Sequence, residues 1–188
     1  MARPRSEDKR NSILAAAVRV IISQGTSAPT ALIAKEASVS NGTLFVYFKT
    51  KAELFNQLYL ELKTDMSSNL LQGLPAQASL RDQMHHMWLR WMTWARGNPD
   101  KRKALAVLAT YEELTPETRK IAQTKMASLG ALVEQCRMNG SLKDAPLPFV
   151  AAIMNSMGET TMDFMIQDPA NAEKHCETGF NALWKALQ

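Results

Sequence analysis

The pattern of apolar positions is helical along almost the whole chain. Near the N-terminus, Ile13, Leu14, Ala17, Val18 and Ile21 recur on one face at intervals of three and four residues, the spacing of an amphipathic α-helix. Gly, Pro and Asn separate the helical segments, and no convincing strand alternation is found. The sequence therefore predicts an all-α protein with about nine helices, at residues 6–24, 29–37, 41–48, 51–72, 79–96, 100–110, 116–139, 147–167 and 170–187.

The second and third helices form a helix-turn-helix in this prediction. They are short, and the tight turn between them falls on Ser38. Ala34 and Ala37 provide small side chains where the helices cross, and Ser40 can cap the third helix. The first free N–H groups of that helix, from Asn41 onward, favour a phosphate or the edge of a base in the major groove.

Charge is concentrated in the same part of the chain. Residues 1–51 contain eight Lys and Arg but three Asp and Glu, whereas the remainder contains 14 basic and 15 acidic residues. A basic module on a near-neutral body indicates a polyanionic partner, with nucleic acid favoured over a membrane surface. The alternative is a basic surface that serves only solubility.

Composition excludes several other classes of protein. Apolar residues make up 46% of the chain and charged residues 21%, which suits a packed core. No apolar run approaches the roughly 20 residues that a membrane span requires, and the N-terminus lacks the apolar segment of a signal peptide. The two cysteines, Cys136 and Cys176, are too few for a disulfide scaffold. A cytoplasmic protein with reduced thiols and no membrane partner is expected.

The helix-turn-helix segment also carries a family resemblance. Ile33-Ala34, the run from Ala37 to Phe48 (Ala-Ser-Val-Ser-Asn-Gly-Thr-Leu-Phe-Val-Tyr-Phe), Lys51 and Leu54 resemble the DNA-binding signature of TetR/AcrR-family repressors. The chain length, the N-terminal position of the motif and the long helix after it are similar as well. The resemblance implies a DNA-binding domain at 1–50 and a ligand-binding and dimerisation domain at 51–188, with helix 51–72 connecting the two. Residues 2–9, 159–169 and 179–187 are similar to those of multidrug-efflux regulators in this family.

The resemblance assigns roles to residues of the head. Thr30, Tyr47 and Lys51 would contact phosphates, and an N-terminal arm would reach the backbone or the minor groove. Ser38 stands where the family usually has Gly, and Val46 stands where a polar or aromatic residue is common. Ordinary core packing remains an alternative for Phe45 and Tyr47. The predicted DNA-binding residues are Arg3, Arg5, Thr30, Asn41, Gly42, Thr43, Phe45, Val46, Tyr47 and Lys51.

Tryptophan and methionine are concentrated in the predicted body. Trp88, Trp91 and Trp94 lie within seven residues of one another. Flat indole rings and adaptable thioethers suit a cavity for apolar cations, although such a stripe can equally be core. The resemblance implies a ligand pocket within the body, and the predicted ligand-binding residues are Tyr59, Met66, Leu70, Trp88, Trp91, Cys136 and Met154.

No motif for catalysis or metal binding is found. His85 and His86 are adjacent, so they do not share a helix face, and they are predicted to be solvated together with His175. Cys136 is an oxidant sensor or, more simply, a buried structural cysteine. No Gly-rich phosphate loop, nucleophile motif or metal motif occurs. The chain is therefore predicted not to be an enzyme and to need no cofactor or metal.

These observations predict a homodimeric, ligand-responsive transcriptional repressor. Two heads about 34 Å apart would bind a pseudo-palindromic operator in double-stranded DNA. Helices 147–167 and 170–187 would pair across the two-fold axis. The expected interface residues are Leu147, Val150, Met154 and Met157 on the first helix and Ala172, Cys176, Phe180, Leu183 and Leu187 on the second. An apolar or cationic aromatic small molecule would release the DNA. The alternatives are a DNA-binding protein that senses nothing and a helical enzyme with an accessory DNA-binding head.

Overall fold

The structure is a computed structural model that describes residues 7–188. These residues form ten α-helices and one short 3-10 helix, and they contain no strand, which confirms the all-α prediction. The helices are α1 (Glu7–Gln24), α2 (Thr30–Glu36), α3 (Asn41–Tyr47), α4 (Lys51–Leu71), α5 (Leu80–Gly97), α6 (Pro99–Ala109), α7 (Pro116–Lys125), α8 (Ala127–Arg137), α9 (Leu147–Gln167), η1 (Pro169–Asn171) and α10 (Ala172–Leu187).

The chain divides into two compact units. Unit 1 comprises the residues up to 64 together with 98–124, and unit 2 comprises residues 65–97 and 125–188. Helices α4 and α7 each contribute residues to both units. The boundary predicted after residue 50 lies inside unit 1, and the division into a DNA-binding and a ligand-binding domain stays a prediction.

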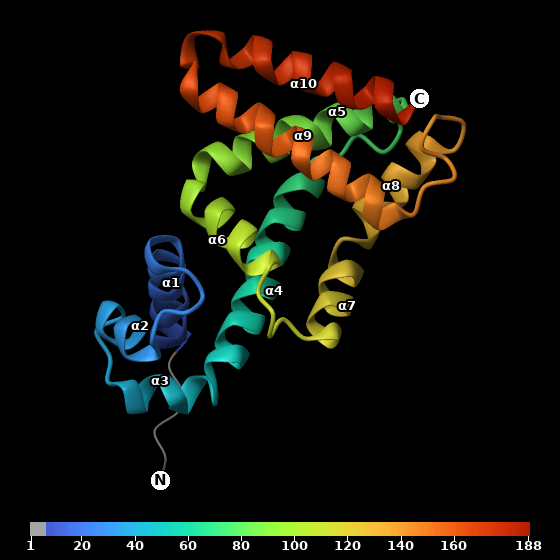
Figure 1. The fold of residues 1–188 in the computed structure, drawn as a ribbon. Helices are drawn as coiled ribbons and strands as arrows, with labels where there is room; N and C mark the ends of the chain where they lie inside the picture. Colours follow the sequence, from blue (N-terminus) through green and yellow to red (C-terminus); the bar gives the residue numbers. More distant parts are fainter. Residues whose placement is uncertain (1–6) are drawn as a thin grey trace. The chain divides into compact units, whose positions relative to one another are not determined.

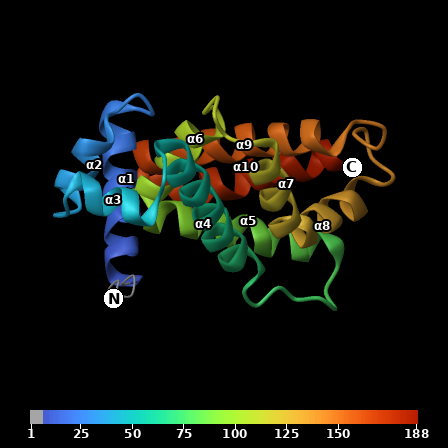
Figure 2. The ribbon, with the colours of Figure 1, turned by 90° about the horizontal axis from the view of Figure 1, so that it is seen from below.

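Unit 1 contains the three-helix head. Helix α1 packs on α2 and α6, and α2 packs on α3 (Figures 1 and 2). The predicted apolar face of α1 closes this core, because Ile13 and Ile21 are fully buried. Ile33 from α2, Leu44 from α3 and Phe48 just after α3 are equally buried. The period of the sequence therefore identified the inward face of α1.

The turn between α2 and α3 falls on Ser38, as the sequence predicts, and it is left-handed there. Ser38 has φ of 56°, the conformation that glycine adopts most readily. Backbone N–H groups of Ala37 and Val39 donate to the carbonyls of Ile33 and Ala34, each at 2.9 Å. These bonds satisfy carbonyls in the last turn of α2 and hold the short connection that leads into α3.

Unit 2 packs α5, α8, α9 and α10 around a core of large side chains. Helix α10 lies beside α9, and both contact α5 (Figures 1 and 2). Trp88 of α5 is 1% exposed, and Phe180 and Leu183 of α10 are buried against the same core. The apolar face of α10 is therefore occupied within the chain itself, which leaves it unavailable for the predicted dimer contact.

The continuous helix predicted at 116–139 is wrong. The structure breaks it into α7 and α8 at Met126, whose φ of −96° and ψ of 4° lie outside the helical range. The Ser67 hydroxyl donates to the carbonyl of Lys125 at 2.9 Å, which gives the end of α7 a hydrogen-bond partner. No Gly or Pro marks this break, so the sequence pattern contains no sign of it.

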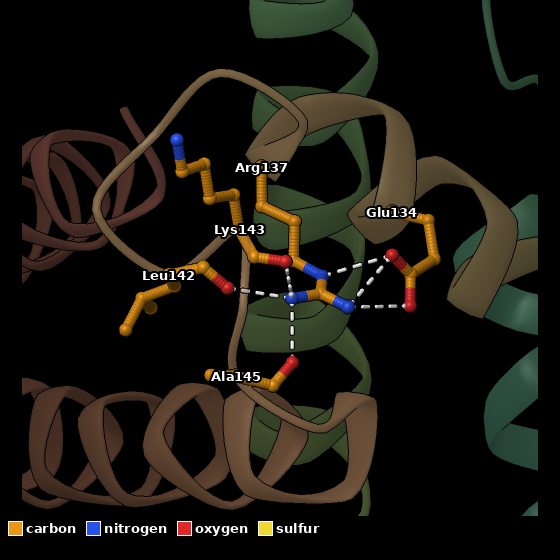
Figure 3. Close-up of polar contacts among 5 residues, drawn as sticks. All are labelled: Glu134, Arg137, Leu142, Lys143 and Ala145. Carbon is orange, nitrogen blue, oxygen red and sulfur yellow. Dashed lines mark hydrogen bonds and ion pairs between the residues drawn. The ribbon is translucent and has the colours of Figure 1, made fainter.

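A buried arginine holds the connection from α8 to α9 (Figure 3). The Arg137 guanidinium donates to both carboxylate oxygens of Glu134, at 2.8 and 2.9 Å. It also donates to the carbonyls of Leu142, Lys143 and Ala145, at 2.5, 2.9 and 2.6 Å. The hydrogen bonds from Arg137 lower the pKa of the Glu134 carboxyl. The Arg137 side chain thus fixes the loop between α8 and α9, which contains no helix.

Replacing Ser38 tests the left-handed turn. A residue with a side chain pays about 1–2 kcal/mol in this conformation, and glycine does not. Ser38→Gly is therefore expected to be more stable than Ser38→Ala by about 1 kcal/mol, the reverse of the order at an ordinary position. Urea unfolding of both variants measures the difference. A Ser38→Ala protein at least as stable as Ser38→Gly would contradict the proposed strain.

Candidate DNA interface and effector residues

The outer face of α3 is exposed and partly apolar. Asn41 and Gly42 at its start are exposed, and Phe45 and Val46 are 40% and 55% exposed. Leu44, which directly precedes Phe45 in the sequence, lies on the opposite face of α3 and is fully buried. The structure therefore places Phe45 on the surface, so core packing does not explain it. A short helix that shows two adjacent large apolar side chains to solvent has the character of a binding surface.

Ser40 caps α3, as predicted. Its hydroxyl oxygen accepts the backbone N–H of Thr43 at 3.0 Å, and the two hydroxyl oxygens lie 2.9 Å apart in a second hydrogen bond. Thr43 is half-exposed, so this bond orients its hydroxyl at the first turn of the helix. The predicted contact of Thr43 with a base stays a prediction.

The predicted phosphate-contacting residues flank α3. Thr30 is the first residue of α2 and Lys51 the first residue of α4, and both are half-exposed, as is Tyr47 at the end of α3. The Lys51 ammonium lies 5.7 Å from the centre of the Phe55 ring. Thr30 and Lys51 stand at helix N-termini, where phosphate binding is favourable, whereas Tyr47 stands at the C-terminal end of α3. Arg3 and Arg5 lie outside the described residues.

The start of α4 is fixed by a capping box. The Glu53 N–H donates to the Thr50 hydroxyl at 3.0 Å, and the Glu53 carboxylate accepts the N–H of Lys49 at 2.8 Å. This reciprocal pair holds the connection from Phe48 to Lys51, and so it positions Lys51 relative to α3 within unit 1.

Two of the basic residues of the head are engaged within the chain. Arg10 forms an ion pair with Glu61, and Arg19 pairs with Glu36 at 2.7 Å. Their charges are therefore largely compensated. The uncompensated positive charge of the described head is carried by exposed lysines, Lys9, Lys35 and Lys49, together with Lys51.

The contacts of Trp88 and Trp91 are those of a packed core. The Trp88 indole donates to the carbonyl of Cys176 at 3.1 Å. Its ring meets Trp91 edge to face, with centroids 5.9 Å apart and planes at 89°, and it also contacts Phe180. Within unit 2 both indoles are buried. Their predicted role as ligand-stacking surfaces stays a prediction, without support from these contacts.

Two glycines let neighbouring helices approach these indoles. A Cβ atom at Gly158 of α9 would lie 2.3 Å from Cη2 of Trp91. A Cβ atom at Gly179 of α10 would lie 2.3 Å from the Thr161 hydroxyl oxygen and 3.0 Å from Cζ2 of Trp88. The indole rings therefore fill space that side chains on α9 and α10 would otherwise take.

The other predicted ligand residues are buried too. Met66, Leu70, Cys136 and Met154 belong to unit 2, whereas Tyr59 belongs to unit 1. Burial raises the pKa of the Cys136 thiol to about 11, so it remains protonated at neutral pH. A protonated thiol is a weak nucleophile, which fits the structural cysteine and not the oxidant sensor.

The histidines do not remain simply solvated, contrary to prediction. His85 is half-buried and lies 2.9 Å from the Glu177 carboxylate. His86 contacts the carbonyl of Gln72 at 3.0 Å, and His175 contacts Asp168 at 3.0 Å. Hydrogen bonds from His175 and then from Asn171 lower the pKa of Asp168. Each of the three imidazole rings therefore has a polar partner, either far away in the sequence or in a turn.

A buried amide that the sequence did not single out joins α4 to the segment before α7. The Asn56 side chain donates to the carbonyls of Ala52 and Glu113, at 2.8 and 2.9 Å. Its oxygen accepts the N–H of Thr115 at 2.9 Å. The sequence around Asn56 gives no sign of a partner almost sixty residues away, so this contact is visible only in the structure.

Residues 7–188 contain no cluster of three or more metal-ligating side chains. No helix in this described part of the chain is both long and apolar enough to cross a membrane.

Part of the chain is similar to known transcription regulators. Residues 13–58 match the family model for bacterial regulatory proteins of the tetR family. Over 81 residues the chain is 31% identical to the uncharacterized HTH-type transcriptional regulator YhgD of Bacillus subtilis. This match spans 43% of the chain and 42% of that protein.

Solved structures share the whole architecture. A TetR family transcription regulator from Marinobacter aquaeolei VT8 has a TM-score of 0.83 at 23% identity, over 98% of both chains. The regulator FadR from Bacillus subtilis, solved in complex with stearoyl-CoA, has a TM-score of 0.66 at 16% identity, over 94% of this chain and 96% of that one. These likenesses confirm the fold of the described residues. The names of these relatives are those of transcription regulators.

Gly158→Ala tests the close packing of α9 on Trp91. The added methyl group would overlap the indole, so we expect a loss of about 1–3 kcal/mol in the free energy of unfolding. Gly130→Ala is the matched control, because a Cβ atom there meets Leu147 at an ordinary 3.5 Å. In the interior of α8 that change should stabilise by about 0.5–1 kcal/mol. Equal stability of the two variants would show that the Trp91 indole moves away from the added methyl group without a loss of stability.

Proposed function

We propose that this chain is a homodimeric transcriptional repressor that binds a pseudo-palindromic operator and releases it when a small molecule binds. The observation that carries the proposal is the outer face of α3. There a capped helix start, two polar residues and two exposed apolar side chains lie together on a basic head. An isolated surface helix would gain nothing from exposing Phe45 and Val46.

The proposed contacts follow from the chemistry of each side chain. Asn41 and Thr43 would hydrogen-bond to base edges in the major groove. Phe45 and Val46 would pack against thymine methyl groups or sugars, and Gly42 would let the backbone approach closely. Thr30, Tyr47 and Lys51 would bind phosphates and set the position of α3 in the groove.

We propose that a second copy of the chain covers α9. This helix is apolar on both sides: Val150 and Met154 face the core of unit 2, while Phe149 and Phe164 are 55% and 52% exposed. Between them, half-buried Ile153 and exposed Ser156 and Thr160 continue the stripe at intervals of three and four residues. The proposed interface therefore uses the face opposite to the one predicted from the sequence, because the predicted face is buried inside the chain.

The effector is proposed to be a small, mainly apolar molecule. FadR, which shares the fold, was solved with stearoyl-CoA, so a long apolar ligand is compatible with this architecture. The sequence predicts an apolar or cationic aromatic molecule and a role in multidrug efflux. Both remain proposals that rest on the Trp and Met content and on the similar segments. A cytoplasmic site of action follows from the proposed contact with DNA.

Two alternatives are less well supported. A DNA-binding protein that senses nothing would not need a helical body of over a hundred residues. A helical enzyme would need a cluster of polar residues in the body. The described polar groups there are mostly engaged in caps, ion pairs and loop contacts such as the one at Arg137.

Titrations with two duplexes test the DNA contacts. Asn41→Ala and Thr43→Ala should weaken binding to an operator duplex by about 1–3 kcal/mol, and binding to a random duplex much less. Lys51→Ala should weaken both by similar amounts and reduce the dependence on salt concentration. Fluorescence anisotropy at several salt concentrations provides these values. If all three variants lose the same affinity for both duplexes, the assigned roles are wrong.

Sedimentation equilibrium tests the dimer. The wild-type chain should have twice the 20.9 kDa mass of one chain at micromolar concentration. Phe164→Glu and Phe149→Glu place a charge in the proposed interface and should yield monomers. Ile121→Glu is the matched control, since Ile121 is exposed on α7 and lies outside the stripe. Dimers that persist in both Phe variants would move the interface away from this face of α9.

A further inference from the structure

Arg10 of α1 is held against α4 by several contacts within unit 1. Its guanidinium forms an ion pair with the Glu61 carboxylate and donates to the side-chain oxygen of Gln57 at 3.2 Å. It also lies 5.8 Å from the centre of the ring of Phe48, the fully buried residue directly after α3. One side chain of α1 therefore contacts the end of α3 and two successive turns of α4.

The partners of Arg10 belong to one stripe of α4. Glu53, Gln57 and Glu61 are four residues apart, so their side chains lie one above another on the same face of the helix. The Gln57 amide donates to one Glu53 carboxylate oxygen at 3.1 Å, and the other Glu53 oxygen accepts the N–H of Lys49. These five residues form a continuous chain of contacts, the Arg10 network, from the backbone after α3 along α4 to α1.

The Arg10 network spans helices that do not pack closely. Helix α1 packs on α2 and α6, and α3 packs on α2, but among the described residues α4 is not a close packing partner of α1 or α3. Three residues, 48–50, join α3 to α4. Their backbone angles set the direction of α3 relative to α4, and the network holds this junction through the N–H of Lys49 and through Phe48.

The chemistry of the network favours one geometry. The Arg10 side chain is 26% exposed, and its planar guanidinium donates in fixed directions. Both ends of the Gln57 amide are used, since its nitrogen donates to Glu53 and its oxygen accepts from Arg10. A change in the angle between α1 and α4 would therefore leave half-buried donors without their acceptors, which is unfavourable.

We propose that Arg10 is a positioning residue for DNA recognition, which fixes the orientation of α3 relative to α4 through Gln57 and Glu61. In a dimer this orientation determines the separation of the two α3 helices, and hence the spacing of half-sites that the protein accepts. The inference rests on the proposed function, because it concerns the same DNA-binding face. It adds residues of α1 and α4 to the residues of α3 that meet the DNA.

The charges of the network distinguish positioning from simple electrostatics. Glu61 is an acid on a basic head, so its removal would strengthen DNA binding if only net charge mattered. Gln57 is uncharged, so its removal would then have no effect. Positioning instead predicts that the loss of either side chain weakens binding to the operator.

Titrations of the purified full-length chain with three duplexes test the proposal. The duplexes carry the operator, the operator with one base pair inserted between its half-sites, and a random sequence. The wild type should bind the operator about tenfold more tightly than the lengthened operator. Gln57→Ala and Glu61→Ala should lower operator affinity about fivefold and reduce this preference for spacing to about threefold or less. Affinity for the random duplex should stay equal or rise, and the dependence of binding on salt should not change.

Matched variants assign the effect to the network. Gln123→Ala and Glu112→Ala make the same substitutions at exposed residues of unit 1 whose side chains have no partner among residues 7–188, and they should leave operator affinity unchanged. Gln57→Met preserves the length of the side chain without its hydrogen bonds and should behave as Gln57→Ala. Adding Glu61→Ala to Arg10→Gln should cause little further loss, because both changes break one contact.

The outcomes separate this inference from the proposed function. Operator affinity and spacing preference equal to those of the wild type in Gln57→Ala, Gln57→Met and Glu61→Ala would overturn the role of Arg10 alone. Losses that multiply in the Arg10→Gln/Glu61→Ala protein would do the same. A wild-type chain that binds no operator, or that binds both spacings equally, would overturn the proposed dimeric repressor and this inference with it.

Discussion

The left-handed turn at Ser38 is the constraint on which the head of this protein depends. It lies in the short connection between α2 and α3, and α3 follows it with Leu44 toward the core and Phe45 and Val46 toward solvent. A turn one residue longer or shorter would rotate α3 by about 100° and bury the side chains that are now exposed. Ser40 then caps the helix at the position where its free N–H groups meet solvent.

Where a signal is local, the sequence predicted the structure well. The face of α1 that carries Ile13 and Ile21, the turn at Ser38 and the cap at Ser40 depend on residues within a few positions of one another. Apolar periodicity, handedness and capping chemistry are sufficient to identify them. All nine expected helical segments are therefore found, and the segment 116–139 is found as two helices.

Where a contact joins residues that are far apart in the sequence, the sequence pattern did not predict it or predicted it wrongly. The break at Met126 lies where Ser67 meets the carbonyl of Lys125, and the loop after α8 is held by several hydrogen bonds from Arg137. Helix α9 is apolar on both sides, so its pattern could not say which side faces the core. Packing against α5 and α10 determines which side of α9 is buried. The proposed dimer interface therefore lies on the side opposite to the predicted one.

The same distinction applies to the candidate sites. The residues of the DNA-binding face are nearly contiguous in the sequence, and a motif identifies them. Asn56, by contrast, joins α4 to Glu113 and Thr115, and no pattern in either segment indicates this contact. Tryptophan content pointed to a ligand-stacking surface, whereas in the folded chain Trp88 and Trp91 pack against each other.

Sequence-specific binding to DNA is the central claim of this account. Selection of bound fragments from a random pool of double-stranded DNA by the purified protein tests it most directly. The account predicts enrichment of a pseudo-palindrome whose two half-sites are centred about one helical turn of DNA, or a whole multiple of a turn, apart. A bound pool with no enriched sequence, or a single half-site with no symmetric partner, would contradict it.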